Sequence, residues 1–268
     1  MSGSVIHSQS AAMVPAVYSA GQSPQLPVVI DYPAALALRQ MSMVHDELPK
    51  YLLAPEVSAL LHYVPDLRRK MLLATLWNTG ARINEALALT RGDFSLAPPY
   101  PFVQLATLKQ RTEKAARTAG RTPAGQQTHR LVPLSDSWYV SQLQTMVATL
   151  KIPMKRRNKR TGRTEKARIW EVTDRTVRSW IGEAVAAAAA DGVTFSVPVT
   201  PHTFRHSYAM HMLYAGIPLK VLQSLMGHKS ISSTEVYTKV FALDVAARHR
   251  VQFAMPEVDA VVMLKQLS

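Results

Sequence analysis

Apolar residues recur at helical spacing along most of the chain, from about residue 53 to the C-terminus. Leu67, Met71 and Ala74 share one face of a predicted helix, and Gly80 follows it as a residue type that commonly ends helices. Pro55 suits the first turn of an earlier helix. The same periodicity predicts helices over residues 55–64, 82–89, 138–150, 173–192, 200–216, 218–226 and from 232 onward.

Two short segments have the composition of strands. Residues 102–109 (FVQLATLK) and 129–135 (HRLVPLS) are predicted strands, joined by a long basic hairpin loop. Residues 32–48 predict one short helix near the N-terminus. The expected fold is therefore mainly α with a small antiparallel β-sheet. We expect three parts: a short N-terminal extension (1–48), a main domain (49–250) and a tail helix (251–268).

The composition fits a globular protein and excludes several classes. Hydrophobic residues make up 47% of the 268 residues, which is enough for a sizeable core. The chain has no cysteine, which excludes a disulfide framework and any thiolate metal site. No apolar run approaches the ~18–20 residues that span a bilayer, and the first residues lack the pattern of a secretory signal. We expect a cytoplasmic protein with no membrane partner.

The net charge of +13 is concentrated in two segments. Residues 109–130 contain six Lys/Arg and one acid, residues 151–168 contain nine and one, and together they account for the whole net charge. Such concentration is typical of a polyanion-binding surface, although two solvated loops are the alternative. Neither segment has an apolar face for a membrane. The candidate DNA-contacting residues are Arg111, Lys114, Lys155, Arg156, Arg157, Lys159, Arg160 and Arg163.

A cluster of histidine and arginine follows a predicted helix start. Thr200 is a good N-cap and Pro201 suits the first helical position. His202, Arg205 and His206 then lie in the first turns, where backbone N–H groups and the helix dipole favour anions. Arginine binds phosphate with a planar fork of donors, and histidine can donate a hydrogen bond or move a proton. Taken alone, the cluster fits a polar surface turn equally well.

A zinc site is the competing interpretation of this cluster. His202 and His206 are four residues apart, as are the two zinc ligands of H-E-x-x-H motifs. Thr203 stands where that motif has glutamate, no carboxylate follows nearby, and Arg205 would place a permanent cation beside the metal. The chain also lacks the clustered carboxylates of two-metal nucleases and the G-x-x-x-x-G-K-[ST] nucleotide motif. We therefore expect no metal and no cofactor.

Three more segments complete a recognisable pattern. Residues 79–89 read TGARINEALAL and contain Arg82 and Glu85, while Tyr237 lies nine residues after His228 of a Gly-His pair. Together with the H-x-x-R-H run, these motifs in this order resemble the phage integrase-like tyrosine recombinase family, over residues 50 to about 245. The resemblance implies the tyrosine recombinase catalytic-domain fold and a site-specific DNA recombinase of the bacterial cytoplasm. Short members that resolve plasmid multimers are the most similar.

The resemblance also implies roles for individual residues. Arg82 and Arg205 would clamp the non-bridging oxygens of the scissile phosphate and stabilise the pentacoordinate transition state. Tyr237 would attack phosphorus and leave a 3′-phosphotyrosyl link. His202 would accept the tyrosine proton or donate to the phosphate, and His228 would hydrogen-bond the phosphate.

A lysine at the hairpin between the two strands acts as general acid in this family. Lys109, at the end of the first predicted strand, is the best match. Lys114 is the alternative, because the loop is longer than usual for the family. Glu85 is expected to support the arginine site rather than to react.

Partners follow from the same resemblance. We expect a double-stranded DNA recombination site, a homo-oligomer that is tetrameric in the synapse, and accessory DNA-bending proteins as further candidates. Family members usually carry a larger N-terminal DNA-binding domain than residues 1–48 can form, so the two basic segments are expected to help hold DNA. The tail helix packs either on a neighbouring subunit or on its own domain. A non-catalytic DNA-binding protein on this scaffold and a type IB topoisomerase remain as alternative functions.

Overall fold

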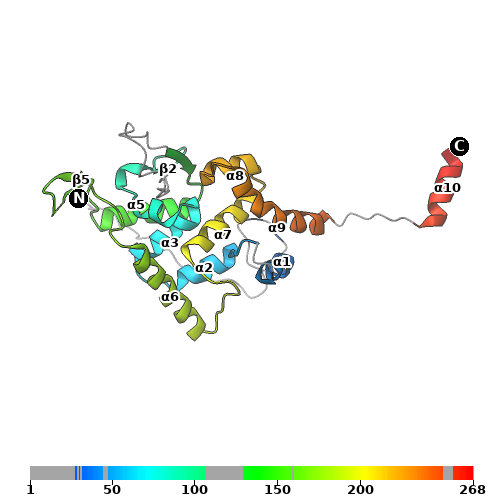
Figure 1. Cartoon of the computed structure of the whole chain (residues 1–268), viewed down its shortest axis with the longest axis horizontal. Coiled ribbons are helices and arrows are strands. Elements are labelled where there is room, and N and C mark those ends of the chain that lie inside the picture. The colour runs from blue at the N-terminus through cyan, green and yellow to red at the C-terminus, as the bar shows by residue number, and fades with distance from the viewer. Residues whose placement is uncertain are drawn as a thin grey trace, which may run out of the picture.

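The computed structural model describes residues 28, 30, 32–44, 48–106, 129–158, 160–249 and 256–267. Helices dominate within these ranges, and the sheets are small and antiparallel, which confirms the predicted fold class (Figure 1). The helices are α1 (Tyr32–Val44), α2 (Ala54–His62), α3 (Leu67–Thr79), α4 (Ile83–Leu87), α5 (Ser137–Thr149), α6 (Asp174–Ala190), α7 (Pro201–Tyr214), α8 (Leu219–Met226), α9 (Ser232–His249) and α10 (Glu257–Leu267).

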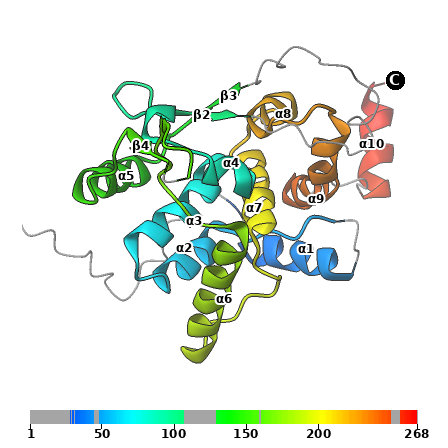
Figure 2. The ribbon, with the colours of Figure 1, turned by 60° about the vertical axis from the view of Figure 1, so that its left-hand side comes forward.

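Helix α3 lies at the centre of the main domain and is buried on nearly all sides. Its residues from Met71 to Leu76 are fully buried, and the helix packs against α5 and α7 (Figure 2). The Asp66 carboxylate caps its start by accepting from the Arg69 amide at 2.8 Å. Gly80 ends it in the left-handed region, with φ 58°, as the sequence predicts.

Helix α4 is shorter than its predicted range of 82–89. Arg82 is its N-cap, and the helix ends at Leu87. The chain then turns into a short 3-10 segment at Arg91–Asp93, because the Asp93 carboxylate accepts from the Thr90 amide at 2.7 Å and its hydroxyl at 2.8 Å. The prediction was therefore wrong by about half a turn at the C-terminal end.

The predicted hairpin forms the larger sheet. Strand β2 (Phe102–Ala106) pairs antiparallel with β3 (His129–Pro133), Val103 opposite Val132 and Leu105 opposite Arg130. The two-residue strand β1 (Phe94–Ser95) extends this sheet to the order β1-β2-β3. The predicted strand end at 107–109 and the loop after it lie outside the described residues.

The sequence predicted neither a helix nor a strand in the basic segment 151–168, and the structure corrects this. Strands β4 (Lys155–Arg157) and β5 (Thr164–Lys166) pair as an antiparallel hairpin. The turn is built by Asn158, whose side-chain oxygen accepts from the amides of Arg160 at 2.9 Å and Thr161 at 3.1 Å. The basic residues of this segment therefore stand on a defined element and not on a free linker.

Two hydrophobic clusters make up the described core. The larger one surrounds α3 and takes residues from α2, α5, α6, β2 and β3. The smaller one joins α7, α8 and α9 with Ala35 of α1 and with Tyr51 and Leu53. Tyr237 of α9 belongs to this second cluster and is 2% exposed.

Helix α1 confirms the short helix predicted near the N-terminus, and it packs against α9 (Figure 2). Arg39 anchors it: this 2% exposed residue forms an ion pair with Glu56 and donates to the Ser196 hydroxyl at 2.5 Å. The Glu56 carboxylate also accepts from the Leu53 amide at 2.7 Å. Part of the N-terminal extension is thereby tied to α2 and to Ser196, and it packs against the helix that contains Tyr237.

Helix α10 lies within the predicted tail of residues 251–268, begins after Pro256, and lies apart from the other described helices (Figure 1). Its apolar side chains are open to solvent, and the exposed fractions of Val258 and Leu264 are 74% and 64%. Among the described residues, no helix is both long enough and apolar enough to cross a bilayer.

Candidate active site

The N-terminus of α7 is fixed by its own first residues. The Thr200 hydroxyl accepts from the Thr203 amide at 3.1 Å, and Pro201 follows at the first helical position, as predicted. The Thr203 hydroxyl donates to the Pro198 carbonyl at 2.7 Å, which ties the helix start to the preceding segment. The orientation of the histidines and the arginine that follow is therefore set by a well-capped helix.

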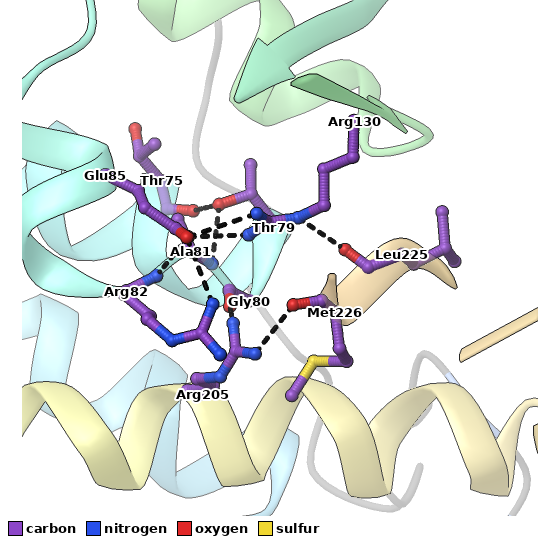
Figure 3. Close-up of polar contacts among 10 residues, drawn as sticks. All are labelled: Thr75, Thr79, Gly80, Ala81, Arg82, Glu85, Arg130, Arg205, Leu225 and Met226. Atoms are coloured by element: carbon purple, nitrogen blue, oxygen red, sulfur yellow. Dashed lines mark hydrogen bonds and ion pairs between the residues drawn. The ribbon is translucent and has the colours of Figure 1, made fainter. Parts of the chain in front are cut away.

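Arg205 is buried and held at both ends of its guanidinium group. It is 2% exposed and donates to the Gly80 carbonyl and, at 2.7 Å, to the Met226 carbonyl (Figure 3). These two bonds use two of the five N–H donors of the group. Burial and the charge of Arg82 lower the pKa of Arg205 to about 10, so it stays cationic near neutral pH.

Glu85 lies between two arginines and orients both. Its side chain is fully buried, and Arg130 donates to its two carboxylate oxygens at 3.2 and 2.6 Å. Arg82 donates to the same carboxylate through its amide at 2.9 Å and its guanidinium at 3.1 Å (Figure 3). Burial acts to raise the pKa of Glu85, but the bonds and charges of Arg130 and Arg82 outweigh it and hold the pKa below its usual value.

Arg130 is a site residue that the sequence analysis missed. It sits on β3, is 8% exposed, and donates through Nε to the Leu225 carbonyl at 2.8 Å. Arg130 and Arg205 thus hold two successive carbonyls at the end of α8, just before His228. The sequence predicted the strand that contains Arg130. It could not predict the contact with Glu85, which lies 45 residues away and depends on tertiary packing.

Two glycines allow this close packing. Gly80 has φ 58°, and a Cβ there would meet Cδ1 of Tyr208 at 2.3 Å. Gly227 has φ 64°, and a Cβ there would meet the Arg130 side chain at 3.0 Å. Both positions therefore need glycine for conformation and for space. Gly80 lies two residues before Arg82, and Gly227 lies directly before His228.

The Tyr237 hydroxyl contacts a histidine to which the resemblance assigned no role. His206 Nδ1 lies 2.9 Å from Tyr237 Oη, and the two rings meet edge to face at 5.5 Å between centroids. The ring of His202 packs against the ring of His206, with 4.5 Å between their centroids. The only available signal was the H-x-x-R-H run, since 31 residues separate His206 from Tyr237.

Burial and nearby cations shape the protonation of the site. Burial raises the pKa of Tyr237 to about 12, against the opposing charges of Arg205 and Arg82. Burial, His202 and Arg205 lower the pKa of His206 to about 3. The two pKa values lie far apart, so transfer of the proton from Tyr237 to His206 is unfavourable in the free protein. In the DNA-free protein the pair is therefore a neutral phenol beside a neutral imidazole.

His202 and His228 lie near the same arginines. His202 is exposed on the first turn of α7, and burial of part of its ring together with Arg205 and Arg82 lowers its pKa. His228 is half-buried, its Nδ1 lies 2.8 Å from the Thr234 hydroxyl, and burial with Arg205 and Arg82 lowers its pKa to about 4. Both histidines are neutral near pH 7.

The structure thus brings together most of the predicted site. Arg82 pairs with Glu85, and the charges of Arg82 and Arg205 act on His202, His228 and Tyr237. The guanidinium groups of Arg82 and Arg205 lie close together (Figure 3). The Arg82 side chain is 40% exposed, so this cationic pair is open to solvent on one side. Lys109, Arg111, Lys114 and Lys159 lie outside the described residues.

The second basic segment presents its charge on the β4–β5 hairpin. Lys155, Arg157, Arg160 and Arg163 are exposed. Arg156 differs from them, because it is paired with Glu165 at 2.8 Å and with Glu171. Four of the five described candidates therefore present their charge to solvent. Among the described residues there is no group of three or more His, Asp or Glu side chains that could hold a metal ion.

The comparisons with known proteins define the class. The model of the phage integrase family matches residues 50–243. The chain belongs to this family, and it is a site-specific tyrosine recombinase. The mainly α tyrosine recombinase catalytic-domain fold is thereby confirmed.

Individual relatives are similar over most or all of their length. A protein of Escherichia coli (strain K12) named "Resolvase" is 95% identical over 268 residues, which covers all of both chains. A "Probable site-specific recombinase in afa region" of Escherichia coli is 48% identical over 238 residues, 89% of each chain. The crystal structure of the XerH recombinase bound to a palindromic difH substrate, a post-cleavage complex, has a TM-score of 0.53 at 19% identity, over 76% of this chain and 53% of that one.

Proposed function

We propose that the protein cuts and rejoins DNA through a 3′-phosphotyrosyl link at Tyr237, and that it resolves plasmid multimers. The observation that supports this best is the pair Arg82 and Arg205 (Figure 3), whose charges act on both Tyr237 and His228. The K12 relative named "Resolvase" and the XerH complex with difH DNA support the DNA substrate. Residues 49–250 would be the catalytic domain, with 1–48 and 251–268 as an extension and a tail.

The two arginines would bind the scissile phosphate. Arg205 is preorganised by the Gly80 and Met226 carbonyls, and Arg82 by Glu85, so neither has to find its position when DNA arrives. Their charges would bind the non-bridging oxygens and stabilise the additional negative charge of the pentacoordinate transition state. His202 and His228 would donate hydrogen bonds to the same phosphate, since both are neutral near pH 7 and each keeps one N–H.

The reaction balances without a cofactor. The Tyr237 oxygen forms a bond to phosphorus while the bond from phosphorus to the 5′-oxygen breaks. The phenol proton passes to a histidine of the H-x-x-R-H run, and Lys109 supplies a proton to the departing 5′-oxygen, with Lys114 as the alternative donor. The phosphotyrosyl ester conserves the energy of the broken bond, so a 5′-hydroxyl from a second strand reverses the step. The exchange needs neither ATP nor a metal ion.

The grip on DNA would come from the two basic segments, one of which includes the exposed residues of the β4–β5 hairpin. The active assembly would be a tetramer on two sites, because each chain has one Tyr237. Helix α10 would join the copies: its apolar side chains are exposed, and an apolar helix face of this kind is stabilised by burial against another surface. Accessory DNA-bending proteins would set the geometry of the synapse.

The experiment begins with selection of a binding site from a random duplex pool. The selected site is cloned twice, in direct repeat, into a supercoiled plasmid and incubated with the protein. Resolution predicts two smaller circles, and none with Tyr237→Phe. Relaxed topoisomers from a plasmid with one site would instead indicate type IB topoisomerase activity. Binding without any strand breakage would indicate a non-catalytic DNA-binding protein.

A further inference from the structure

We propose that His206 accepts the phenol proton of Tyr237 during attack on the scissile phosphate. This inference rests on the proposed role of Tyr237 as nucleophile. It assigns the proton transfer to the second histidine of the H-x-x-R-H run, and it leaves His202 to the phosphate. His206 touches the reacting oxygen directly, which makes it a catalytic residue in the strict sense.

The geometry places one ring nitrogen on the hydroxyl. His206 Nδ1 lies 2.9 Å from Tyr237 Oη, which is within the reach required of a general base. The imidazole cannot swing freely, because its ring lies against the rings of both His202 and Tyr237, at centroid distances of 4.5 and 5.5 Å. It projects from the second turn of α7, whose start is fixed by the Thr200 cap.

The charges around His206 keep its ring neutral. Arg205, His202 and His228 all disfavour a cationic His206, and so does burial. A neutral imidazole has one acceptor nitrogen, and a protonated phenol has one donor hydrogen. In the tautomer that has its hydrogen on Nε2, Nδ1 accepts the hydrogen bond from the Tyr237 hydroxyl. The proposed proton transfer uses this tautomer.

The Tyr237 hydroxyl is also close enough to Arg205 and Arg82 for their charges to lower its pKa against the effect of burial. A phosphate bound by these arginines would therefore lie near the hydroxyl, so that His206 takes the proton while phosphorus receives the oxygen. A hydroxyl held only to satisfy a buried polar group would need an acceptor, but not one that can take up a proton.

The chemistry balances and explains why the resting pair is inert. The bond from Tyr237 oxygen to phosphorus forms as the O–H bond breaks, the proton passes to Nδ1, and the 5′-oxygen departs with a proton from the lysine. The large difference between the proton affinities of the two groups keeps the proton on the tyrosine until phosphorus begins to draw electrons from its oxygen. Bound phosphate also offsets the cationic charge that disfavours a protonated His206. In the reverse step His206 returns the proton.

The test compares two substitutions that differ in one respect. The amide oxygen of His206→Asn can accept the hydroxyl hydrogen bond but cannot take up a proton, whereas His206→Ala can do neither. His211→Asn is the matched control, since His211 lies on the same helix and contacts Trp77 rather than Tyr237. The rate of covalent adduct formation is measured in a single turnover on the selected site with a nick beside the cleavage point, at saturating protein.

We expect His211→Asn to match the wild type and both His206 variants to be slower by about 10²–10⁴-fold, the usual loss of a general base, with DNA affinity unchanged. Free imidazole should accelerate His206→Ala, because it can enter the space left by the ring. A His206→Asn rate within tenfold of the wild type would overturn the inference, since acceptance of a hydrogen bond alone would then suffice.

A second measurement checks the pair in the free protein. Tyrosine labelled with ¹³C at Cζ gives a resonance for Tyr237 that Tyr237→Phe identifies. We expect this resonance to move in His206→Ala, to return toward the wild-type position in His206→Asn and to stay in place in His211→Asn. An unmoved resonance in His206→Ala would overturn the contact.

The two proposals can fail separately. If wild-type protein bound to its site formed no adduct, the proposed function and this inference would both fail. Fast adduct formation by His206→Asn would overturn the inference alone.

Discussion

Glu85 shows how single residues hold the site together. Its carboxylate is fully buried and binds Arg130 and Arg82, while Arg130 also holds the end of α8. Because removal of one partner leaves a buried charge without compensation, Glu85→Ala should lower the free energy of unfolding by about 3–5 kcal/mol. Urea denaturation followed by circular dichroism measures this.

The control for this prediction is an ion pair at the surface. Glu183 pairs with Arg69 at 2.9 Å, and both side chains are largely exposed, at 59% and 42%. Glu183→Ala should therefore change the free energy of unfolding by no more than about 1 kcal/mol. Equal effects of the two substitutions would contradict the structural role of Glu85.

The buried histidines give the stability a definite pH dependence. The folded state lowers the pKa of His206 to about 3, below the ordinary value of about 6.5, so the unfolded state binds more protons between these values. The contribution of neutral His206 to the free energy of unfolding is complete above pH 6.5 and is lost as the pH falls toward about 3. Between pH 7 and pH 5 the free energy of unfolding should fall by about 2 kcal/mol more for the wild type than for His206→Asn. Parallel urea titrations of both proteins at the two pH values test this. An equal change in the free energy of unfolding for the two proteins would contradict it.

At the scale of elements, the β4–β5 hairpin offers the sharpest prediction. Lys155, Arg157 and Arg160 are exposed on it. If they contact DNA phosphates, replacing all three with alanine should lower the slope of log affinity against log salt by about 2–3, roughly one per lost contact. Fluorescence anisotropy with the selected site measures the slope. Arg69→Ala should leave it unchanged, and an unchanged slope in the triple variant would exclude the hairpin from the DNA-binding surface.

The sequence predicted most helices because their signals are local. Thr200 caps α7 and Gly80 ends α3, as expected from residue type and spacing alone. Thr173 and Gly227 do the same for α6 and α8. The β4–β5 hairpin was missed because strands of three residues are too short for an alternating pattern.

The site was predictable only as a set of residues. The family motifs indicated Arg82, Arg205 and Tyr237, but no periodicity indicates which side chains meet. The contact of His206 with Tyr237 spans 31 positions and that of Arg130 with Glu85 spans 45, so both depend on how α7, α9 and β3 pack. The role of a local motif can be predicted from the sequence. Which side chain contacts which can be seen only in the tertiary structure.

At the scale of the whole molecule, α10 exposes apolar side chains of the kind that helices normally bury. The exposed fractions of Val261 and Leu264 are 51% and 64%. If α10 docks on a neighbouring copy, deletion of residues 256–268 should abolish higher-order complexes on DNA while single-site binding persists. Val261→Asp with Leu264→Asp should reproduce the loss, since a buried charge without a partner is unfavourable. Native gel shifts measure both, and unchanged complexes would place the helix against its own domain.

The central claim is that Tyr237 becomes covalently joined to DNA in a site built by Arg82 and Arg205. The most direct measurement is to incubate the protein with the selected site, nicked beside the cleavage point, and to separate the products on a denaturing gel. The account predicts a protein–DNA adduct that is absent with Tyr237→Phe, and a nucleotide mass on the Tyr237 peptide after digestion. An adduct that persists in Tyr237→Phe, or none at all on DNA that the wild type binds, would contradict it.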